Sequence, residues 1–378
     1  MITRTKSLAG VALLAFAAFV LTACAATEEA AMDETNTAGA EANSSLSGTL
    51  VGAGASSQGS AQEAWVAGFQ TANPDVPVTY DPIGSGGGRE TFQSGASSFA
   101  GSDRAFKVDE ITEGPFGSCV EEAGIWEIPA YISPIAIIFN LEGISSLNLD
   151  ADTLAQIFTG EITNWNDAAI ASQNAGVDLP DLAITAVHRS DESGTTANFT
   201  DYMSKASTDF WLLAGENAGS FEAWPAEWGG EGAPQTSGVV DAVTNGTGTI
   251  GYADASRAGS LGTVSVKVGS EYVPYSAEAA AKIVDASPAA NPGERGDNDL
   301  AIELDRATEA SGTYPIVLVS YLIGCNDYAD DSVVDLVKGY VSYVVSEEGQ
   351  LAAQANAGNA PISADSRAKA EAILASIQ

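Results

Sequence analysis

The chain has 378 residues, of which 50 are Asp or Glu and 15 are Lys or Arg, so its formal net charge is −35. This excess of negative charge argues against nucleic acid as a partner, because the phosphate backbone would be repelled. One histidine and three cysteines leave little material for a metal centre or a histidine-based active site, and the length suits two lobes better than one core.

The N-terminus, residues 1–23, has the pattern of a secretory signal peptide. Arg4 and Lys6 precede an apolar run, 8–21, which is too short to span a bilayer comfortably and ends in small residues. Cys24 follows directly, which resembles the bacterial lipoprotein signal, in which this cysteine becomes the lipidated first residue. The alternative is a plain signal peptide with an incidental cysteine.

Residues 24–47 contain almost no large apolar side chain, so they cannot bury enough surface to fold. We expect them to form a flexible linker between a lipid anchor and the folded body. The protein is therefore predicted to lie outside the cytoplasm, on the outer face of the cell membrane, and to touch the membrane through the lipid only.

Strand and helix patterns alternate along residues 48–378, which predicts an α/β fold. Strands are expected at 50–52, 76–80, 128–139, 183–188, 249–252, 263–268 and 314–323. Helices are expected at 61–70, 152–158, 195–205, 239–244, 277–284, 332–345 and 366–377. The stretch 219–238 is predicted to be a long loop, whose Trp224 and Trp228 either pack beneath it or line a cleft.

Two long apolar runs open at Ile128-Pro129 and at Tyr314-Pro315, with each proline at a strand start where its missing N–H does no harm. Each is predicted to be a hinge strand that leaves one lobe and enters the other. Lobe I then comprises residues 48–130 plus 314–378, and lobe II comprises residues 131–313.

Cys119 and Cys325 remain after the N-terminal signal, and an exported chain permits disulfides. We predict that they pair. Both fall in lobe I under the hinge assignment, which does not depend on them. The alternative is two buried free thiols.

Three segments rich in Gly and Ser, 52–57, 84–88 and 193–195, lie where helices are expected to begin. Free backbone N–H groups and the positive end of the helix dipole favour a negative charge there, and small residues let an oxyanion approach the main chain. Together the segments predict a pocket for a small anion.

Arg189 precedes the third segment and supplies a planar, always charged guanidinium for two oxygens of an anion. The N–H groups of Gly194 and Thr195 and the hydroxyls of Ser193 and Thr195 could converge on the same ion. Asp191 could hold the guanidinium from behind. Taken alone, the Ser-Gly-Thr sequence is more often a helix N-cap without a ligand.

Four segments in this order resemble the ligand segments of the phosphate-binding proteins that serve bacterial phosphate ABC transporters. They are GAGAS at 52–56, IGSGGG at 83–88, GSD at 101–103 and RSDESGT at 189–195. The resemblance implies a two-lobe periplasmic-binding-protein fold of type II, in which each lobe is a mixed sheet flanked by helices and two hinge strands cross between the lobes. It further implies a monomer without cofactor or enzyme activity, which binds inorganic phosphate in the interlobe cleft and delivers it to an ABC permease.

The same resemblance implies which residues contact phosphate: Ser56, the backbone of Ser57, Ser85, Asp103, Arg189, Ser193, Gly194 and Thr195. The family usually has Thr-Phe-Pro where this chain has Ser56, Ser57 and Gln58, so a hydroxyl and an N–H survive while the packing differs. Arg104 also departs from the small residue of some relatives, and it is expected to screen the carboxylate of Asp103.

Asp103 would explain selectivity. Hydrogen phosphate has a proton to donate to a carboxylate, whereas sulfate at neutral pH has none and would leave two acceptors facing each other. The alternative is a surface acid in a loop.

Three rival functions remain. An exported serine hydrolase would need a partner histidine, and the only one, His188, precedes Arg189 on an expected strand, without a G-x-S-x-G motif elsewhere. A binder of sulfate, molybdate or an organic anion could use the same two-lobe plan, although a fully deprotonated oxyanion would not favour Asp103. A surface adhesin with a vestigial site is the third.

Overall fold

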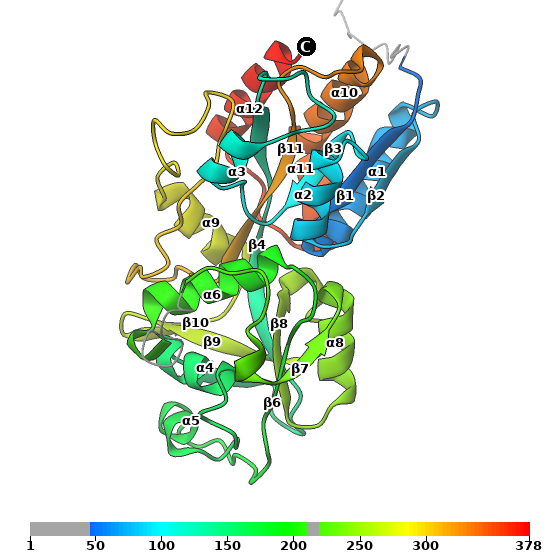
Figure 1. The fold of residues 1–378 in the computed structure, drawn as a ribbon. Coiled ribbons are helices and arrows are strands. Elements are labelled where there is room, and N and C mark those ends of the chain that lie inside the picture. The colour runs from blue at the N-terminus through cyan, green and yellow to red at the C-terminus, as the bar shows by residue number, and fades with distance from the viewer. Residues whose placement is uncertain (1–45, 211–218) are drawn as a thin grey trace, which may run out of the picture. The chain divides into compact units, whose positions relative to one another are not determined.

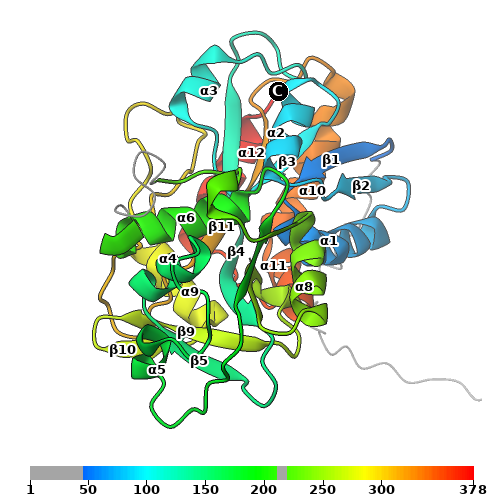
Figure 2. The same cartoon turned by 60° about the horizontal axis from the view of Figure 1, so that its bottom comes forward.

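Two long, fully buried strands, β4 (Ile125–Phe139) and β11 (Val317–Cys325), run antiparallel through the middle of the computed structural model, which describes residues 46–210 and 219–378. The first half of β4 pairs with β11 in one sheet, and its second half pairs with β8 (Thr249–Asp254) in another. Figures 1 and 2 show these strands passing between two lobes, so each lobe has its own set of helices around a shared pair of hinge strands.

The sheet of lobe I has the strand order β2, β1, β3, β11, β4, with β1 parallel to β2 and β3 and with β11 antiparallel to β3. Its short strands are β1 (Leu50–Gly54), β2 (Val78–Asp81) and β3 (Phe99–Ser102). Its helices are α1 (Gly59–Ala72), α2 (Ser85–Gln93), α3 (Val108–Glu113), α10 (Val334–Val345), α11 (Glu347–Ala357) and α12 (Ala364–Ser376), with the 3-10 turns η1 (Ser56–Gln58) and η5 (Asp331–Val333).

The sheet of lobe II continues from β4 through β8, β6 (Thr185–Arg189) and β7 (Glu231–Ala233), and β9 (Gly262–Val268) also pairs with β4. Strands β5 (Ser146–Leu149) and β10 (Glu271–Val273) pair with β9. The helices are α4 (Ala151–Phe158), α5 (Ala168–Gln173), α6 (Gly194–Ala206), α8 (Gln235–Asn245) and α9 (Ala277–Ala286), with the 3-10 turns η3 (Ala226–Trp228) and η4 (Ala255–Arg257).

Local chemistry explains where the helices nearest the cleft begin. Ser193 caps α6 by accepting from the N–H of Thr196 (3.2 Å), and Asp150 caps α4 in the same way. Gly84, with φ of 99°, turns the chain into α2 in a conformation that glycine alone adopts at little cost. The glycine and serine segments therefore stand at helix starts, as the sequence predicts.

The predicted disulfide between Cys119 and Cys325 is present, with the Cα atoms 5.2 Å apart. It joins the end of β11 to the loop that leads into β4. The bridge therefore ties the lobe I ends of the two hinge strands together.

The prediction that a strand opens at Pro129 is wrong. β4 begins at Ile125, and Pro129 lies inside it, opposite Tyr321, where the pairing with β11 shifts between Ser320 and Tyr321. This irregularity in the ladder accommodates a residue that has no N–H to donate. Pro315 does lie just before its strand.

The stretch 219–238 is not loop throughout, since it contains η3, β7 and the start of α8. Its tryptophans pack beneath it, since Trp224 stacks on His188 with ring centroids 5.0 Å apart and Trp228 contacts Trp224 edge to face.

The segment around residues 295–300 lies beside lobe I, although the predicted boundary assigns it to lobe II. Asn298 O accepts from the N–H of Glu127, and the N–H of Leu300 donates to Glu127 O. The predicted signal peptide, Cys24 and most of the linker lie outside the described residues. Among residues 46–210 and 219–378, no helix is long and apolar enough to cross a membrane.

Candidate anion-binding site

The glycine- and serine-rich segments of the two lobes meet at the hinge strands. In lobe I, the N–H of Gly84 donates to Gly54 O (2.8 Å), which joins the start of α2 to the end of β1. Across the cleft, the N–H of Gly86 donates to Glu192 O (3.4 Å), just before α6. Segments separated by about a hundred residues in the sequence thus form one site, with α2 and α6 beginning on its two sides (Figures 1 and 2).

Asp103 lies at the centre of this site and is 3% exposed. Its Oδ1 accepts from the hydroxyls of Ser57 and Ser320, each at 2.6 Å, and its Oδ2 accepts from the Thr195 hydroxyl at 3.1 Å. Its N–H donates to Ser85 Oγ at 3.1 Å. Ser57, Ser85 and Thr195, which are all predicted to contact phosphate, therefore each hydrogen-bond to Asp103, which is predicted to contact it as well.

Burial raises the pKa of the Asp103 carboxyl above its usual value. Hydrogen bonds from Ser320 and Ser57 and the positive charge of Arg189 oppose this effect, because they favour the ionised form. The surrounding donors are mostly neutral hydroxyls, so the carboxylate is solvated without being neutralised by a direct ion pair.

Arg189 ends β6 and is 2% exposed. Its Nε and Nη2 donate to Asp191 Oδ1 (2.8 Å) and Oδ2 (2.5 Å), a two-pronged pair that fixes the plane of the guanidinium. Asp191 also accepts from the N–H of Gln235 (2.9 Å), which anchors it to the start of α8. Although burial acts against ionisation, the bonds and charge of Arg189 lower the pKa of Asp191, so the pair stays charged.

Gly194, at the start of α6, lies where a side chain would prevent the lobes from meeting. A Cβ atom there would be 2.5 Å from Ser85 Oγ and 2.6 Å from Asp103 Cβ. The glycine therefore allows the N-terminus of α6 to approach the lobe I segments. Ser193 Oγ accepts the capping bond and keeps its own proton to donate.

Ser56 has a different environment from the other predicted contacts. Its hydroxyl faces Thr236, 3.0 Å from Thr236 Oγ1 and 3.2 Å from Thr236 N, so it joins η1 to the start of α8 across the cleft. Ser56 therefore closes one side of the site, while its contact with an anion stays a prediction.

The expectation that Arg104 screens Asp103 is wrong. Its guanidinium pairs with both oxygens of Glu110, at 2.7 and 2.8 Å, and with Glu222 at 2.9 Å. These partners hold it away from the Asp103 carboxylate. Its chain neighbour therefore leaves Asp103 free of a direct ion pair.

Sequence reasoning missed several residues of the site. Tyr252 accepts from the N–H of Arg189 (3.2 Å) and bonds Thr196 Oγ1 (2.7 Å), and Glu222 bridges to Arg89 and Arg104 of lobe I. Ser320 can be found from the sequence, because a serine in an otherwise apolar strand indicates a buried hydroxyl with a specific partner. Glu222 gives no such signal, because its partners are set by the tertiary fold alone.

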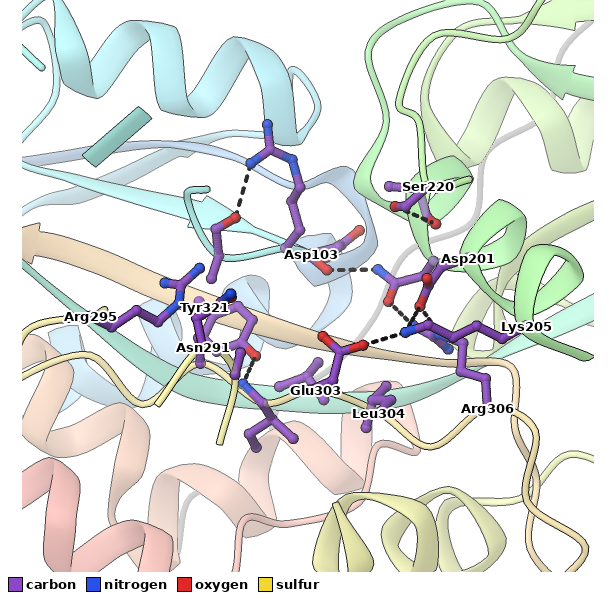
Figure 3. A pocket seen from close by; sticks show the side chains of 18 residues that line it. Asp103, Asp201, Lys205, Ser220, Asn291, Arg295, Glu303, Leu304, Arg306 and Tyr321 are labelled. Atoms are coloured by element: carbon purple, nitrogen blue, oxygen red, sulfur yellow. Dashed lines mark hydrogen bonds and ion pairs between the residues drawn. The ribbon is translucent and has the colours of Figure 1, made fainter. Parts of the chain in front are cut away.

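A pocket of about 200 Å³ lies on the far side of Asp103, between α6 and the segment that precedes β11 (Figure 3). Its charged groups are paired. Lys205 pairs with Asp201 and Glu303, Arg306 donates to Asp201 at 2.6 Å, and Arg104 and Arg295 pair with acids that do not line the pocket. The main-chain oxygen of Asp103, in its wall, accepts from Asn198 at 2.6 Å. Asn198, in the wall of this pocket, therefore supports the main chain at Asp103, and the pocket offers no unpaired charge to a ligand.

The site has the groups to hold an anion, and the chain's single histidine is held beside it by packing. His188 is half-buried, stacked on Trp224, and its Nδ1 lies 2.8 Å from Arg189 O. Burial lowers its pKa, so it is a packed, neutral side chain. No cluster of three potential metal ligands occurs within the described residues.

A family model described as a PBP superfamily domain matches residues 39–348 of the chain. Phosphate-binding protein PstS3 of Mycobacterium bovis (strain BCG / Pasteur 1173P2) is 34% identical over 346 residues, which cover 89% of this chain and 90% of that protein. Phosphate-binding protein PstS of Xylella fastidiosa (strain Temecula1 / ATCC 700964) is 36% identical over 228 residues, or 60% of this chain and 58% of its own length.

Solved structures share the fold. A high-affinity periplasmic phosphate-binding protein (PfluDING) bound with phosphate aligns with a TM-score of 0.67 and 22% identity, over 86% of this chain and 93% of that one. A phosphate-binding protein from Stenotrophomonas maltophilia aligns with a TM-score of 0.62 and 20% identity over the same shares. At these identities the likeness establishes the two-lobe α/β architecture.

Proposed function

We propose that this chain, which belongs to the phosphate-binding proteins of the PBP superfamily, binds inorganic phosphate between its lobes and delivers it to an ABC permease for import. The observation that carries the proposal is the buried Asp103, which lies among hydroxyls from both lobes. It is close enough to Arg189 for the positive charge to lower its pKa.

Arg189 supplies the positive charge that attracts the anion. Because Asp191 fixes its Nε and Nη2, the guanidinium is oriented before the ligand arrives, and less entropy is lost on binding. The backbone N–H groups at the start of α6, around Gly194 and Thr195, supply further donors together with the helix dipole.

Asp103 supplies the selectivity. An ionised carboxylate accepts the proton of hydrogen phosphate, whereas a fully deprotonated oxyanion would present another acceptor to it and leave both unpaired. The remaining predicted contacts, the hydroxyls of Ser85 and Ser193 and the backbone of Ser57, complete the set of donors.

Delivery requires that the ligand favour one arrangement of the lobes, because the permease must distinguish loaded from empty protein. Direct contacts between the lobes at the site, such as Thr195 to Asp103, support a ligand-linked closure. We further propose that the chain acts as a monomeric, non-enzymatic receptor, secreted by its N-terminal signal and anchored by lipid at Cys24.

Calorimetric titration of the wild-type protein with phosphate, sulfate and arsenate tests this function, with tryptophan fluorescence recorded alongside. We expect micromolar or tighter phosphate binding, no sulfate binding under the same conditions, and a fluorescence change because Trp224 packs on His188 beside Arg189. Sulfate binding as tight as phosphate binding would favour a general oxyanion receptor. Release of phosphate from an ester in the same preparation would instead favour a hydrolase.

A further inference from the structure

A chain of buried hydrogen bonds runs from the helices of lobe I to Asp103. Tyr340 OH donates to Gln62 Oε1 (2.6 Å), Gln62 Nε2 donates to Gln58 Oε1 (2.8 Å), and Gln58 Nε2 donates to Ser320 Oγ (2.6 Å). Ser320 Oγ then reaches Asp103 Oδ1 at 2.6 Å. Gln58 and Ser320 are fully buried, and each link is a side chain with at most 3% exposure.

The direction of every bond in this chain is fixed by chemistry. Gln58 Nε2 lies 3.1 Å from the carbonyl oxygen of Tyr321, which only accepts, so this end of the amide must be the nitrogen. The Oε1 of Gln58 must then accept from Gln62, whose own Oε1 is left for the proton of Tyr340. Ser320 accepts from Gln58, so its single proton goes to Asp103.

The chain therefore ends in a hydroxyl whose proton is directed at Asp103. With Ser57, it places two donors on Oδ1, while Oδ2 lies toward Thr195 at the start of α6. An ionised carboxylate accepts from both hydroxyls on Oδ1, whereas a proton on that oxygen would remove at least one of these two donated bonds. The arrangement selects the charged acceptor and turns Oδ2 toward the anion site.

We propose that Gln58 and Ser320 are positioning residues that hold Asp103 as a hydrogen-bond acceptor, with Oδ2 presented to the ligand. Neither residue belongs to the predicted contact set. The role in ligand choice rests on the proposed phosphate function, whereas the effect on Asp103 itself does not.

Other charged and titratable groups near Asp103 are accounted for. Arg189, from β6, favours its ionised form, and Tyr80, from β2, stays neutral because burial and the charge of Asp103 raise its pKa well above the usual value. Arg104, next in the chain, is paired with Glu110 and Glu222. The side chains of Gln58 and Ser320 hydrogen-bond to none of these three groups.

The direct test is a carboxyl-carbon NMR titration of the ligand-free, full-length protein, with the Asp103 signal assigned by its loss in Asp103→Asn. Ser320→Ala should raise the pKa of Asp103 by roughly one unit, since a hydrogen bond to a charged group is worth about that much. Gln58→Leu should raise it in the same direction, and should add nothing in the Ser320→Ala background, because it acts through Ser320.

Ser97→Ala is the matched control, since Ser97 is a buried serine of lobe I whose hydroxyl has no partner among the described residues. It should leave the Asp103 titration unchanged. Should Gln58→Leu fail to fold, Tyr340→Phe removes only the far donor and should give a smaller rise. An Asp103 pKa that is unchanged in Ser320→Ala, or additive effects in the double variant, would overturn the positioning role.

Ligand choice gives the second readout. Relative to wild type, Ser320→Ala and Gln58→Leu should lose phosphate affinity about tenfold on acidification and begin to bind sulfate there, because a protonated Asp103 donates to it. A generally distorted site would instead lose both anions at every pH, and that result counts against the proposal. Failure of the wild type to bind phosphate would reject the proposed function, while the NMR titration would still decide the effect on Asp103.

Discussion

Two carboxylates join the lobes, and their surroundings differ. Asp103 is surrounded by hydroxyls of Ser57, Ser320 and Thr195, whereas Glu222 receives the guanidinium groups of Arg89 (2.5 Å) and Arg104 (2.9 Å). Both are largely buried between segments of the two lobes. The Asp103 carboxylate accepts hydrogen bonds from neutral hydroxyls, whereas the charge of the Glu222 carboxylate is neutralised by two guanidinium groups.

This difference separates recognition from closure. A carboxylate that is already paired with two cations has little capacity to accept a proton from a ligand, so Glu222 is suited to holding the lobes together. A carboxylate held by hydroxyls keeps its charge and an oxygen for the ligand, so Asp103 is suited to choosing the anion. The following variants test this division of roles. The first removes Arg189, the cation that attracts the anion and favours the ionised form of Asp103.

Arg189→Met should have the largest effect. It removes the cation of the site and leaves the partly buried Asp191 with only the N–H of Gln235 as a donor, and truncating one member of such a charge pair costs about 2–5 kcal/mol. Phosphate affinity by calorimetry should fall by about two orders of magnitude or more. Arg367→Met is the control, because that guanidinium bonds Val345 O on α10, and affinity should not change. A loss below threefold in Arg189→Met would remove Arg189 from the site.

A third buried carboxylate, Asp254, tests what hydroxyl surroundings do without a cation. It is fully buried beside hinge strand β4 and accepts from Tyr131 and Ser256, and burial raises its pKa to about 6. Because the folded state holds this proton more tightly than the unfolded state, stability from this group is present at low pH and lost as the pH rises through about 6.

The free energy of unfolding of wild type minus that of Asp254→Asn should therefore fall by about 2 kcal/mol between about pH 4 and about pH 7, measured by urea unfolding. Asp330→Asn provides the control on the surface, where bonds from Ser332 lower the pKa, so no such fall is expected. A flat difference for Asp254→Asn would show that the hinge carboxylate ionises normally.

Asp103→Asn addresses recognition itself. The amide presents a donor in place of an acceptor, so phosphate affinity should fall by about 10- to 100-fold, while sulfate loses less or gains. The ratio of the two affinities, measured by calorimetry, is the informative quantity. Equal losses for both anions would mean that Asp103 supports the site without selecting the ligand.

Segments with a strong local signal could be predicted from the sequence. The starts of α2 and α6 follow from glycine and serine after apolar strands, and the convergence of Arg189 with Asp191 follows from their spacing on one turn of chain. The disulfide could be inferred because only two cysteines remain in the body. Each of these depends on a few neighbouring residues or on a count.

Features that depend on tertiary register could not be predicted. The bond between Gln58 and Ser320 joins residues 262 positions apart, and nothing local indicates it. Pro129 lies inside a strand only because the ladder with β11 shifts beside it, and β7 is too short, at three residues, to show a period. For the same reason, the interlobe partners of Ser56 and Glu222 became visible only in the fold.

Glu222→Gln should have the smallest effect and tests the other half of the comparison. The amide keeps the shape but loses the charge that faces Arg89 and Arg104, and Arg104 retains Glu110 while Arg89 retains Ser102. Phosphate affinity should fall by only about three- to tenfold, because a less stable closed state lowers the affinity for phosphate and for sulfate by the same factor.

The ratio of phosphate to sulfate affinity decides between closure and recognition for Glu222. In Glu222→Gln this ratio should stay at the wild-type value, because Asp103 and its hydroxyls are intact, whereas in Asp103→Asn it should fall. The N–H of Ser193 donates to Glu222 O through the main chain, so the variant keeps that support of α6. A changed ratio in Glu222→Gln would mean that the ion cluster also shapes the site, and that closure and recognition are not separable in this protein.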